Sequence, residues 1–396
     1  MVGPLSGTRV LDFTWVLAGP YATMVLADLG AEVIKVEPPN GGDFSRHFGP
    51  YFDGDVSHYF LSINRGKKSI TVNLKTKRGN EIIRDLVKQA DVLVENFVPG
   101  TMARLGLAYE QLREINPRLI YASASGFGHS GPYMDRPAYD VIVQAMAGTM
   151  SLTGEPGRPS VRVGYSIGDM GASLFTVIGV LAALNERERS GLGQHVDIAM
   201  LDSQVALLEN AVTRYFCSGK VPAKIGSRHP SIAPFQAYRS KDGEFVLGAA
   251  NDRQWQAVCS ALGLRHLLED ERFLSNDLRV THADEMEAEI EAVTTRMTTD
   301  ECLARLMEAQ VPCGPVQTID KVVQDPQLAA REMFVEVEHP RAGRLKVTGS
   351  PLKLSRTPGR VERASPDLGE HTAEVLGELL GYSPAEVEAL REQGIV

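Results

Sequence analysis

The chain has 396 residues, which is long for a single core and predicts two domains. Its apolar share of 43% is that of a globular protein, and its net charge of -9 argues against a general nucleic-acid binder. No run of eighteen apolar residues predicts a membrane span, and the N-terminus does not resemble a signal peptide. The cysteines lack C-x-x-C spacing, so we expect a cytoplasmic protein with reduced thiols and without a metal site or a disulfide; they are Cys217, Cys259, Cys302 and Cys313.

The first 125 residues alternate apolar strands with helices. We expect strands at 10–13, 31–37, 69–74, 91–97 and 119–124, and helices at 20–29, 77–90 and 100–115. This alternation predicts an α/β domain with a doubly wound, mostly parallel sheet of the Rossmann-like type. Ligands of such sheets bind at the carboxyl ends of the strands, which here carry Trp15–Ala18, Lys75, Asn96-Phe97 and Ser125–Gly128.

A glycine-rich loop, Gly126–Gly131, follows the last of these strands and satisfies the G-x-G-x-x-G pattern of dinucleotide-binding proteins. That pattern needs a helix to begin on its last glycine, but Pro132 and Pro137 intervene. The acidic residue expected at a strand end about twenty positions later is missing, because Glu155 lies among glycine and proline. An NAD-dependent dehydrogenase is therefore disfavoured, and the glycines either let the loop approach another ligand or make turns.

The most informative stretch is Gly164–Gly171, which contains Asp169 and precedes a run of small and apolar residues. Residues 172–184 predict a buried helix, which charged residues and Gly191 then end. Asp169 therefore lies at or just before the N-terminus of this helix, where backbone N–H groups and the helix dipole stabilise an anion. Position alone favours a plain helix cap. The alternative is a nucleophilic carboxylate, which the neighbouring glycines leave approachable.

The second half of the chain continues with a strand at 195–200, a helix at 201–216 and a linker at 218–230. Beyond it we expect strands at 235–239 and 244–249, helices at 252–262, 283–297 and 300–309, strands at 333–338 and 345–348, and helices at 372–379 and 384–392. Thr298 and Glu301 predict a capping box at the start of one of these helices. We predict a large domain formed by residues 1–215 and 327–396, with a smaller α+β domain, residues 225–325, inserted between them.

Several phrases of the chain occur together in one known family. They are Val16–Pro20, Leu26–Glu37, Asn64–Ile70, Val94–Gly100, Gly126–Tyr133, Gly168-Asp169 and Leu368–Thr372. Through them the chain resembles, over essentially its whole length, the class III CoA-transferases of the formyl-CoA transferase type, the CaiB/BaiF family. The resemblance favours Asp169 as a nucleophile over Asp169 as a cap.

This resemblance implies an enzyme that moves coenzyme A from an acyl-CoA to a free carboxylic acid, without a metal or a prosthetic group. Asp169 would attack the thioester, and the released thiolate would open the anhydride to an aspartyl-CoA thioester before the acceptor acid takes its turn. Gly168 and Gly171 would leave room and backbone N–H donors for the developing oxyanion. The family also implies a homodimer whose two chains thread through one another like linked rings.

The resemblance also assigns a set of CoA-binding positions. They are Val16, Leu17, Ala18, Val72, Asn73, Leu74, Lys75, Asn96, Phe97, Arg104 and Arg136. Lys75 and Arg104 have the chemistry that CoA phosphates need, and Phe97 suits a packing contact with adenine or pantetheine; without the resemblance they would be surface charge and sheet-edge packing. Two positions depart from the formyl enzyme: Leu17 replaces a glutamine, and Pro38 replaces a CoA-binding arginine. Arg136 is the candidate for the charge that a lysine supplies in that enzyme.

The region of the acceptor acid departs further from the formyl enzyme, which has a run of four glycines over its aspartate. The matching segment here, Val246–Asp252, contains only Gly248, so formyl-CoA and oxalate are disfavoured. Residues Gly226–Tyr238 are more similar to the succinate–hydroxymethylglutarate and related dicarboxylate CoA-transferases, which implies succinyl-CoA as donor and a dicarboxylate as acceptor. Arg228 and His229 would then hold the distal carboxylate, or they would only cap a domain linker.

Two other functions compete with CoA transfer. An α-methylacyl-CoA racemase resembles the chain over most of its length, but it supplies a histidine base in a Gly-His-Asp phrase. The matching residues here are Ala138, Tyr139 and Asp140, and His129 lies ten positions earlier. A non-catalytic acyl-CoA-binding protein would gain nothing from an exposed carboxylate at Asp169 when its ligand is an anion. Both alternatives are therefore disfavoured.

Overall fold

The computed structural model describes residues 3–52 and 54–396, and its chain divides into two compact units. The first unit contains the chain up to Thr149, Arg162–Thr213 and Pro326–Val396. The second contains Met150–Val161 and Arg214–Asp325. Each unit has its own apolar core, and each is described by itself below.

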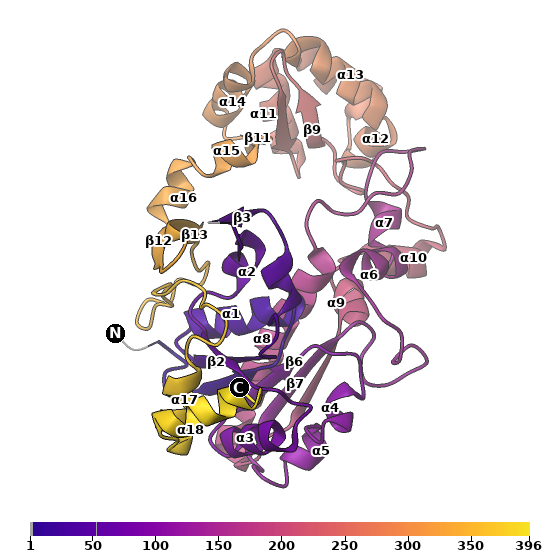
Figure 1. Ribbon diagram of the computed structural model, residues 1–396. Helices are drawn as coiled ribbons and strands as arrows, with labels where there is room; N and C mark the ends of the chain where they lie inside the picture. The colour runs from indigo at the N-terminus through magenta and orange to yellow at the C-terminus, as the bar shows by residue number, and fades with distance from the viewer. Residues whose placement is uncertain (1–2, 53) are drawn as a thin grey trace. The chain divides into compact units, whose positions relative to one another are not determined.

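A six-stranded sheet forms the centre of the first unit (Figure 1). Its strands are β1 (Arg9–Asp12), β2 (Glu32–Glu37), β5 (Lys68–Thr71), β6 (Val92–Glu95), β7 (Ile120–Ser125) and β8 (His195–Ala199). They lie in the order β5-β2-β1-β6-β7-β8, and every neighbouring pair is parallel. In a doubly wound sheet of this order, the ligand crevice opens where the order reverses, between β1 and β6. The predicted α/β fold with a large parallel sheet is confirmed.

Helices cover both faces of this sheet, because successive residues of a strand point to opposite sides. Val10 of β1 packs in the core on the side of α1 (Ala18–Asp28) and α8 (Ile167–Ser190). Leu11 packs in the core on the other side. The helices of that side are α3 (Lys77–Val87), α4 (Thr101–Arg104), α5 (Tyr109–Leu112), α17 (Thr372–Leu380) and α18 (Pro384–Glu392). The strands are consequently apolar on both faces.

The other elements of the first unit are short. They are η1 (Phe44–His47), β3 (Tyr51–Phe52), β4 (Val56–Ser57), α2 (His58–Ile63), α6 (Asp140–Met146), α9 (Met200–Ala206), α16 (Pro326–Ala330), β12 (Phe334–His339) and β13 (Gly343–Thr348). Two further helices, α7 (Thr149–Leu152) and α10 (Ala211–Ser218), contain two of the four points where the chain passes from one unit into the other.

Two of the predicted helices are wrong in their length. The helix expected at 100–115 is broken into α4 and α5, because Gly106 has a φ of 72° and the N–H of Leu107 bonds back to the carbonyl of Met102. The helix expected at 201–216 is broken into α9 and α10, and Glu209 has a φ of 55° at the break. Helix α8 is longer than expected at both ends and closes on Gly191, whose φ is 75°.

The second unit contains an antiparallel sheet with helices packed on it. Its elements are β9 (Phe235–Arg239), β10 (Glu244–Gly248), α11 (Asp252–Leu262), η2 (Arg265–Leu268), η3 (Glu271–Phe273), α12 (Asn276–Thr281), α13 (Ala283–Thr294), α14 (Thr299–Glu308), β11 (Cys313–Pro315) and α15 (Ile319–Val322). The strands lie in the order β11-β10-β9, and the predicted hairpin of β9 and β10 is confirmed. The predicted capping box of Thr298 and Glu301 also forms.

Helix α8 is the most apolar long element. In the described part of the chain it is the one helix that is long and apolar enough, by length and composition alone, to cross a membrane. A run of eighteen consecutive apolar residues does not occur even here, because Asp169 and Asn185 bound the apolar part of the helix. In this structure Val177, Val180 and Ala183 of the helix pack in the core against strands of the sheet. Burial against one face of that sheet accounts for these three residues, whereas Leu174 and Ile178 of the same helix are exposed.

Candidate active site

Asp169 is the third residue of helix α8 and not its N-cap. Ser166 occupies the N-cap position and makes no capping hydrogen bond with its side chain. The N–H of Gly168 donates to Oδ1 of Asp140, the first residue of α6, at 2.8 Å. Within the part of the chain that the structure describes, no hydrogen bond or ion pair engages the Asp169 carboxylate. The interpretation of Asp169 as a plain cap is therefore wrong, because Asp140 performs that function.

The electrostatics around Asp169 disfavour its charge in the free protein. Burial, and secondarily the negative charge of Asp140, raise the pKa of Asp169 from 3.8 to about 7. The positive end of the helix dipole acts in the opposite direction, so desolvation outweighs it. The carboxylate of Asp140 is held in place by Nε2 of Gln144 at 2.7 Å. The two carboxylates consequently have separate functions, since one caps the helix and the other stays without a partner.

Tyr59 of α2 is a further neighbour of Asp169. Burial, followed by the charge of Asp169, raises the pKa of Tyr59 to about 12. The phenol therefore lies within electrostatic reach of the carboxylate. The sequence did not reveal Tyr59, which stands in no motif, and it showed Asp140 only as the last residue of the Ala138-Tyr139-Asp140 phrase, because both reach the surroundings of Asp169 only through the tertiary fold.

The glycines beside Asp169 have a different function from the expected one. A Cβ on Gly168 would lie 2.9 Å from Oδ1 of Asp140, and a Cβ on Gly171 would lie 2.8 Å from Cδ1 of Leu207. Glycine at 168 therefore permits the close approach of Asp140, whereas at 171 the nearest atom is the movable end of the Leu207 side chain. The N–H of Gly168 is already bonded to Asp140, and Gly171 lies far enough into the helix for its N–H to bond within it. The expectation that these two N–H groups are free for an oxyanion is wrong.

The loop between β1 and α1 contains a strained residue, Val16. Its φ is 66°, in the left-handed region, which costs a β-branched side chain on the order of 1–3 kcal/mol. The N–H of Val16 donates to Oδ1 of Asp43 at 3.1 Å. Leu17 then serves as the N-cap of α1, and Ala18 is its first residue. The three residues expected to contact CoA therefore form the turn that starts α1.

This turn is joined directly to the helix that carries Asp169. Oγ of Ser173 donates to the carbonyl of Ala18 at 2.6 Å. The same hydroxyl lies 2.7 Å from the carbonyl of Asp169, one helical turn earlier. The start of α1 and the start of α8 are consequently held side by side through one buried serine.

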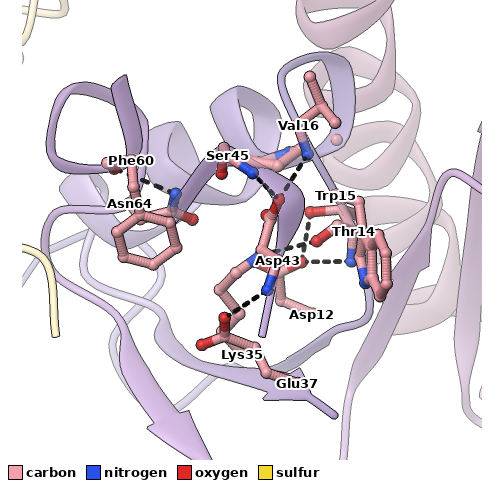
Figure 2. A network of polar contacts seen from close by, with 12 residues as sticks. Asp12, Thr14, Trp15, Val16, Lys35, Glu37, Asp43, Ser45, Phe60 and Asn64 are labelled. Carbon is pink, nitrogen blue, oxygen red and sulfur yellow. Dashed lines mark hydrogen bonds and ion pairs between the residues drawn. The ribbon is translucent and has the colours of Figure 1, made fainter. Parts of the chain in front are cut away.

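Buried charges lie behind the turn, as Figure 2 shows for Lys35 and Asp43. Nζ of Lys35 is 2.9 Å from Oδ2 of Asp43, and Nζ of Lys67 is 2.9 Å from Oδ2 of Asp12; all four side chains are 0% exposed. Burial lowers the pKa of Lys35, but the carboxylates of Asp43 and Asp12 outweigh it and hold that pKa above its ordinary value. Burial lowers the pKa of Lys67 to about 8. Lys35 is therefore the lysine whose charge the carboxylates support more strongly.

The predicted CoA-binding residues after β5 differ in whether their side chains are accessible to a polar ligand. Val72 is buried and Leu74 packs against the same core, so neither side chain is available to a polar ligand. The side chain of Asn73 donates to the carbonyl of Gly394 at 3.3 Å. Lys75 is exposed, and in the described residues no carboxylate pairs with it. Lys75 is the residue of this group with a free charge.

The residues after β6 hold the loop after β1. Nδ2 of Asn96 donates to the carbonyl of Trp15 at 2.8 Å, and Oδ1 accepts the N–H of Trp15 at 2.7 Å. The ring of Phe97 packs against the Trp15 ring with centroids 5.9 Å apart. The amide of Asn96 is therefore engaged by the protein, whereas Phe97 supplies an apolar surface at the strand end.

The two predicted arginines of the first unit are both exposed. Nη2 of Arg104 donates to Oγ1 of Thr101 at 2.9 Å. The guanidinium of Arg136 lies 3.9 Å from the centroid of the Tyr133 ring. Neither pairs with a carboxylate among the described residues, so both charges are available to an anionic ligand.

The predicted acceptor residues lie in the second unit. Arg228 forms ion pairs with Glu287 and with Asp284, the latter at 2.5 Å. Nδ1 of His229 accepts the N–H of Ser231 at 3.1 Å. A Cβ on Gly248 would lie 2.9 Å from the ring of Phe235, so this glycine permits close packing across the hairpin. The positive charge of Arg228 is thus already compensated.

The glycine loop after β7 does not form a dinucleotide site. The next helix, α6, begins at Asp140 and not at Gly131. The N–H of His129 donates to the carboxylate of Asp197 on β8, and a Cβ on Gly126 would lie 2.3 Å from the Cβ of Ala138. The glycines therefore serve close packing and turns, and the dehydrogenase remains disfavoured.

Known proteins are similar to this chain over nearly its whole length. The family model for CoA-transferase family III matches residues 5–372. A succinate–glutarate CoA-transferase of Agrobacterium fabrum is 43% identical over 382 residues, which cover 95% of this chain and 96% of that protein. An acetyl-CoA:oxalate CoA-transferase of Acetobacter aceti is 43% identical over 373 residues, covering 94% of each. A solved CaiB/BaiF family structure from Brucella suis has a TM-score of 0.86 at 40% identity and covers 96% of this chain and 100% of that one.

We predict that Asp169→Asn raises the melting temperature at pH 8. The folded protein holds a proton on Asp169 between pH values of about 4 and 7, where the unfolded chain has released it, so stability is lost as pH rises through that range. The neutral amide removes this loss. Thermal unfolding followed by circular dichroism should show a gain at pH 8 that shrinks towards pH 5.

Asp202→Asn is the matched control, because Asp202 is the exposed third residue of α9. It should give no gain at either pH, since an exposed acidic residue in a first helical turn is mildly stabilising. Equal changes in melting temperature for both variants would contradict the raised pKa of Asp169.

Proposed function

The chain belongs to CoA-transferase family III, and on that premise we propose that it moves coenzyme A from an acyl-CoA to a free dicarboxylic acid through Asp169. The enzyme is thus of the CoA-transferase type. The observation that carries the proposal is the Asp169 carboxylate itself, which is partly buried at the start of α8 without a hydrogen-bond partner in the described residues. Such a carboxylate lacks the solvation that would weaken it as a nucleophile.

The reaction comprises two transfers of CoA, first from the donor to Asp169 and then from Asp169 to the acceptor. A carboxylate oxygen of Asp169 bonds to the carbonyl carbon of the acyl-CoA, the C–S bond breaks, and CoA thiolate leaves an acyl-aspartyl anhydride. The thiolate then attacks the aspartyl carbonyl, which releases the donor acid and forms an aspartyl-CoA thioester. The acceptor carboxylate then attacks the aspartyl-CoA thioester, which releases CoA thiolate and forms a new anhydride. The thiolate attacks the acceptor's acyl carbon of this anhydride, which gives the new acyl-CoA and restores the Asp169 carboxylate. No oxidant, reductant or metal enters the balance, and each step replaces one acyl bond by another.

The position of Asp140 supports this assignment. Because Asp140 takes the N–H of Gly168, Asp169 is not needed to stabilise the helix and can form covalent bonds without uncapping it. Burial, and secondarily the charge of Asp140, keep the pKa of Asp169 high, and a more basic carboxylate is a stronger nucleophile once it is ionised. The helix dipole favours the same anion when substrate displaces water.

We further propose that Lys75 and Arg104 bind the phosphates of CoA, with Arg136 as a third cation. All three are exposed and lack carboxylate partners in the described residues, which supports a function as ligands for an anion. Val16, Leu17 and Ala18 would meet the thioester end through their turn. At Val72, Asn73 and Leu74 the contact would come from the backbone, and Asn96 would act by holding Trp15, beside which Phe97 offers a packing surface.

The acceptor is proposed to be a dicarboxylate, and succinyl-CoA is the proposed donor. Relatives named for glutarate and for oxalate are each 43% identical, so identity does not choose between a long and a short diacid. The single glycine of Val246–Asp252 favours the longer acid. Arg228 would have to exchange Glu287 and Asp284 for the substrate, whereas His229 would need no such exchange.

The assembly is proposed to follow the family. Residues 225–325 would be a small domain inserted into the large one, and two chains would interlock as a homodimer. All four cysteines are free, which supports a cytoplasmic protein. No group of three or more His, Cys, Asp or Glu in the described ranges is arranged to hold a metal ion.

The direct test is mass spectrometry of CoA products after the protein is mixed with succinyl-CoA and a panel of acids. The panel should contain glutarate, hydroxymethylglutarate, citramalate, itaconate and oxalate. We expect a new acyl-CoA with at least one longer diacid, and none with Asp169→Ala, which should still bind CoA within about threefold because the phosphate ligands remain. Transfer at the wild-type rate by Asp169→Ala would disprove the mechanism. Deuterium exchange at the α-carbon of a 2-methylacyl-CoA would instead indicate a racemase.

We predict that the acid limb of the profile of kcat/KM against pH reports the ionisation of Asp169. The carboxylate must be ionised, so kcat/KM should fall as pH drops below about 7. Asp140→Asn keeps an oxygen for the N–H of Gly168 but removes the neighbouring charge, which should shift this limb to lower pH. Asp202→Asn should leave it in place. An unchanged limb in Asp140→Asn would show that Asp140 does not influence the ionisation of Asp169.

We predict that Lys75→Ala and Arg104→Ala each raise KM for the acyl-CoA roughly tenfold while kcat changes little, since a charged hydrogen bond is worth about 1.5–3 kcal/mol. Steady-state kinetics with the acyl-CoA varied would measure this. Arg113→Ala is the control, because Arg113 is also exposed but already pairs with Glu110 at 3.1 Å. A loss of kcat without a change in KM would argue against binding of phosphates.

A further inference from the structure

The turn after β1 is held by side chains from several other elements. Five successive backbone groups, from the N–H of Thr14 to the N–H of Val16, are all bonded in this way. The N–H of Thr14 donates to Asp12 at 2.8 Å, and its carbonyl accepts from Nζ of Lys35 at 2.7 Å. Asn96 bonds both polar groups of Trp15, and Asp43 accepts the N–H of Val16. The conformation of the turn is therefore imposed from outside it (Figure 2).

Among these side chains, Asp43 is the one that bonds the strained residue, Val16. It bonds the N–H of Val16, whose left-handed φ of 66° a valine does not adopt without compensation. Its Oδ1 also accepts the N–H of Ser45 at 2.9 Å, and its Oδ2 is 2.9 Å from Nζ of Lys35. Both oxygens are consequently fixed in direction. Because Lys35 also bonds the carbonyl of Thr14, the pair holds the turn at two points two residues apart.

Val16 is connected to Asp169 through Ala18 and the hydroxyl of Ser173. Ala18, two residues after Val16, accepts from Oγ of Ser173, and the same oxygen lies 2.7 Å from the carbonyl of Asp169. A relaxed Val16 would alter the direction in which the chain enters α1. The relation between that turn and the Asp169 carboxylate would then change.

We propose that Asp43, fixed by Lys35, is a positioning residue that keeps Val16 left-handed and so sets the turn Val16–Ala18 against the start of α8, where the acyl-CoA thioester meets Asp169. The inference rests on the proposed function, because it assigns the thioester to this turn. Asp43 touches no substrate and acts through Val16. Its loss should therefore affect kcat more than the binding of CoA.

The test is a double-mutant cycle between Asp43 and Val16. Asp43→Ala should lower kcat at least tenfold, with KM for succinyl-CoA changed less than threefold. Val16→Gly provides the second background, because glycine adopts a φ of 66° without strain. In that background Asp43→Ala should lower kcat no more than threefold. If Asp43→Ala does not fold, Asp43→Asn replaces it in both backgrounds, with a smaller loss of the same pattern.

Asp28→Asn is the matched control. Asp28 pairs with Arg65 at 2.6 Å, and both side chains are buried, but neither contacts residues 14–18 through a hydrogen bond in the described structure. It should lower the melting temperature as Asp43→Asn does and leave kcat within twofold. Equal losses of kcat from Asp43→Ala in both backgrounds, or an equal loss from Asp28→Asn, would overturn the inference and leave the proposed function intact. Absence of transfer by the unsubstituted enzyme would overturn both.

Discussion

The site depends on the burial of two lysines with two carboxylates: Lys35 of β2 pairs with Asp43, which precedes η1, and Lys67, which precedes β5, pairs with Asp12 at the end of β1. An unpaired buried ion costs several kcal/mol, so Lys35 and Lys67 are tolerated there only because Asp43 and Asp12 face them. These pairs also direct hydrogen bonds at the backbone. The first strand-to-helix turn, where dinucleotide-binding folds use flexible glycine-rich backbone, is here held by fixed charges around a strained valine.

A second principle is the division of labour between two carboxylates. The first turn of a helix exposes backbone N–H groups, and a neighbouring carboxylate commonly accepts hydrogen bonds from them. A carboxylate engaged in this way is a weaker nucleophile. In this chain Asp140 of α6 accepts the N–H of Gly168 at the start of α8. The Asp169 carboxylate, in the first turn of α8, has no hydrogen-bond partner among the described residues. The cost is a carboxylate whose charge burial and repulsion both oppose. Reactivity and helix stability are thus assigned to different residues.

Sequence patterns predicted the sheet, the hairpin and most helices, because periodicity and end signals are local; α11 and α18 occur with the predicted bounds. The helices predicted at 100–115 and 201–216 are too long, since left-handed backbone at Gly106 and Glu209 interrupts them; a glycine is a local stop signal, whereas nothing in the sequence marks Glu209. Asp169 could be found from its glycine-rich setting and family motif. Tyr59, Asp43 and the capping function of Asp140 could not, because nothing local shows that a side chain meets an N–H or a carboxylate far away in the sequence.

The apolar character of α8 has a consequence for synthesis of the chain. The buried residues that pack with Val177, Val180 and Ala183 lie on β1, α1, β2, β6 and β7, or just beside them, and all of them precede α8 in the sequence. When this helix leaves the ribosome, the strands and the helix on which these three residues pack have therefore already been translated, whereas β8 and α9, which also pack on α8, follow it directly in the chain. This face of an apolar helix can thus pack on the sheet as it emerges, before most of the remaining half of the polypeptide is made.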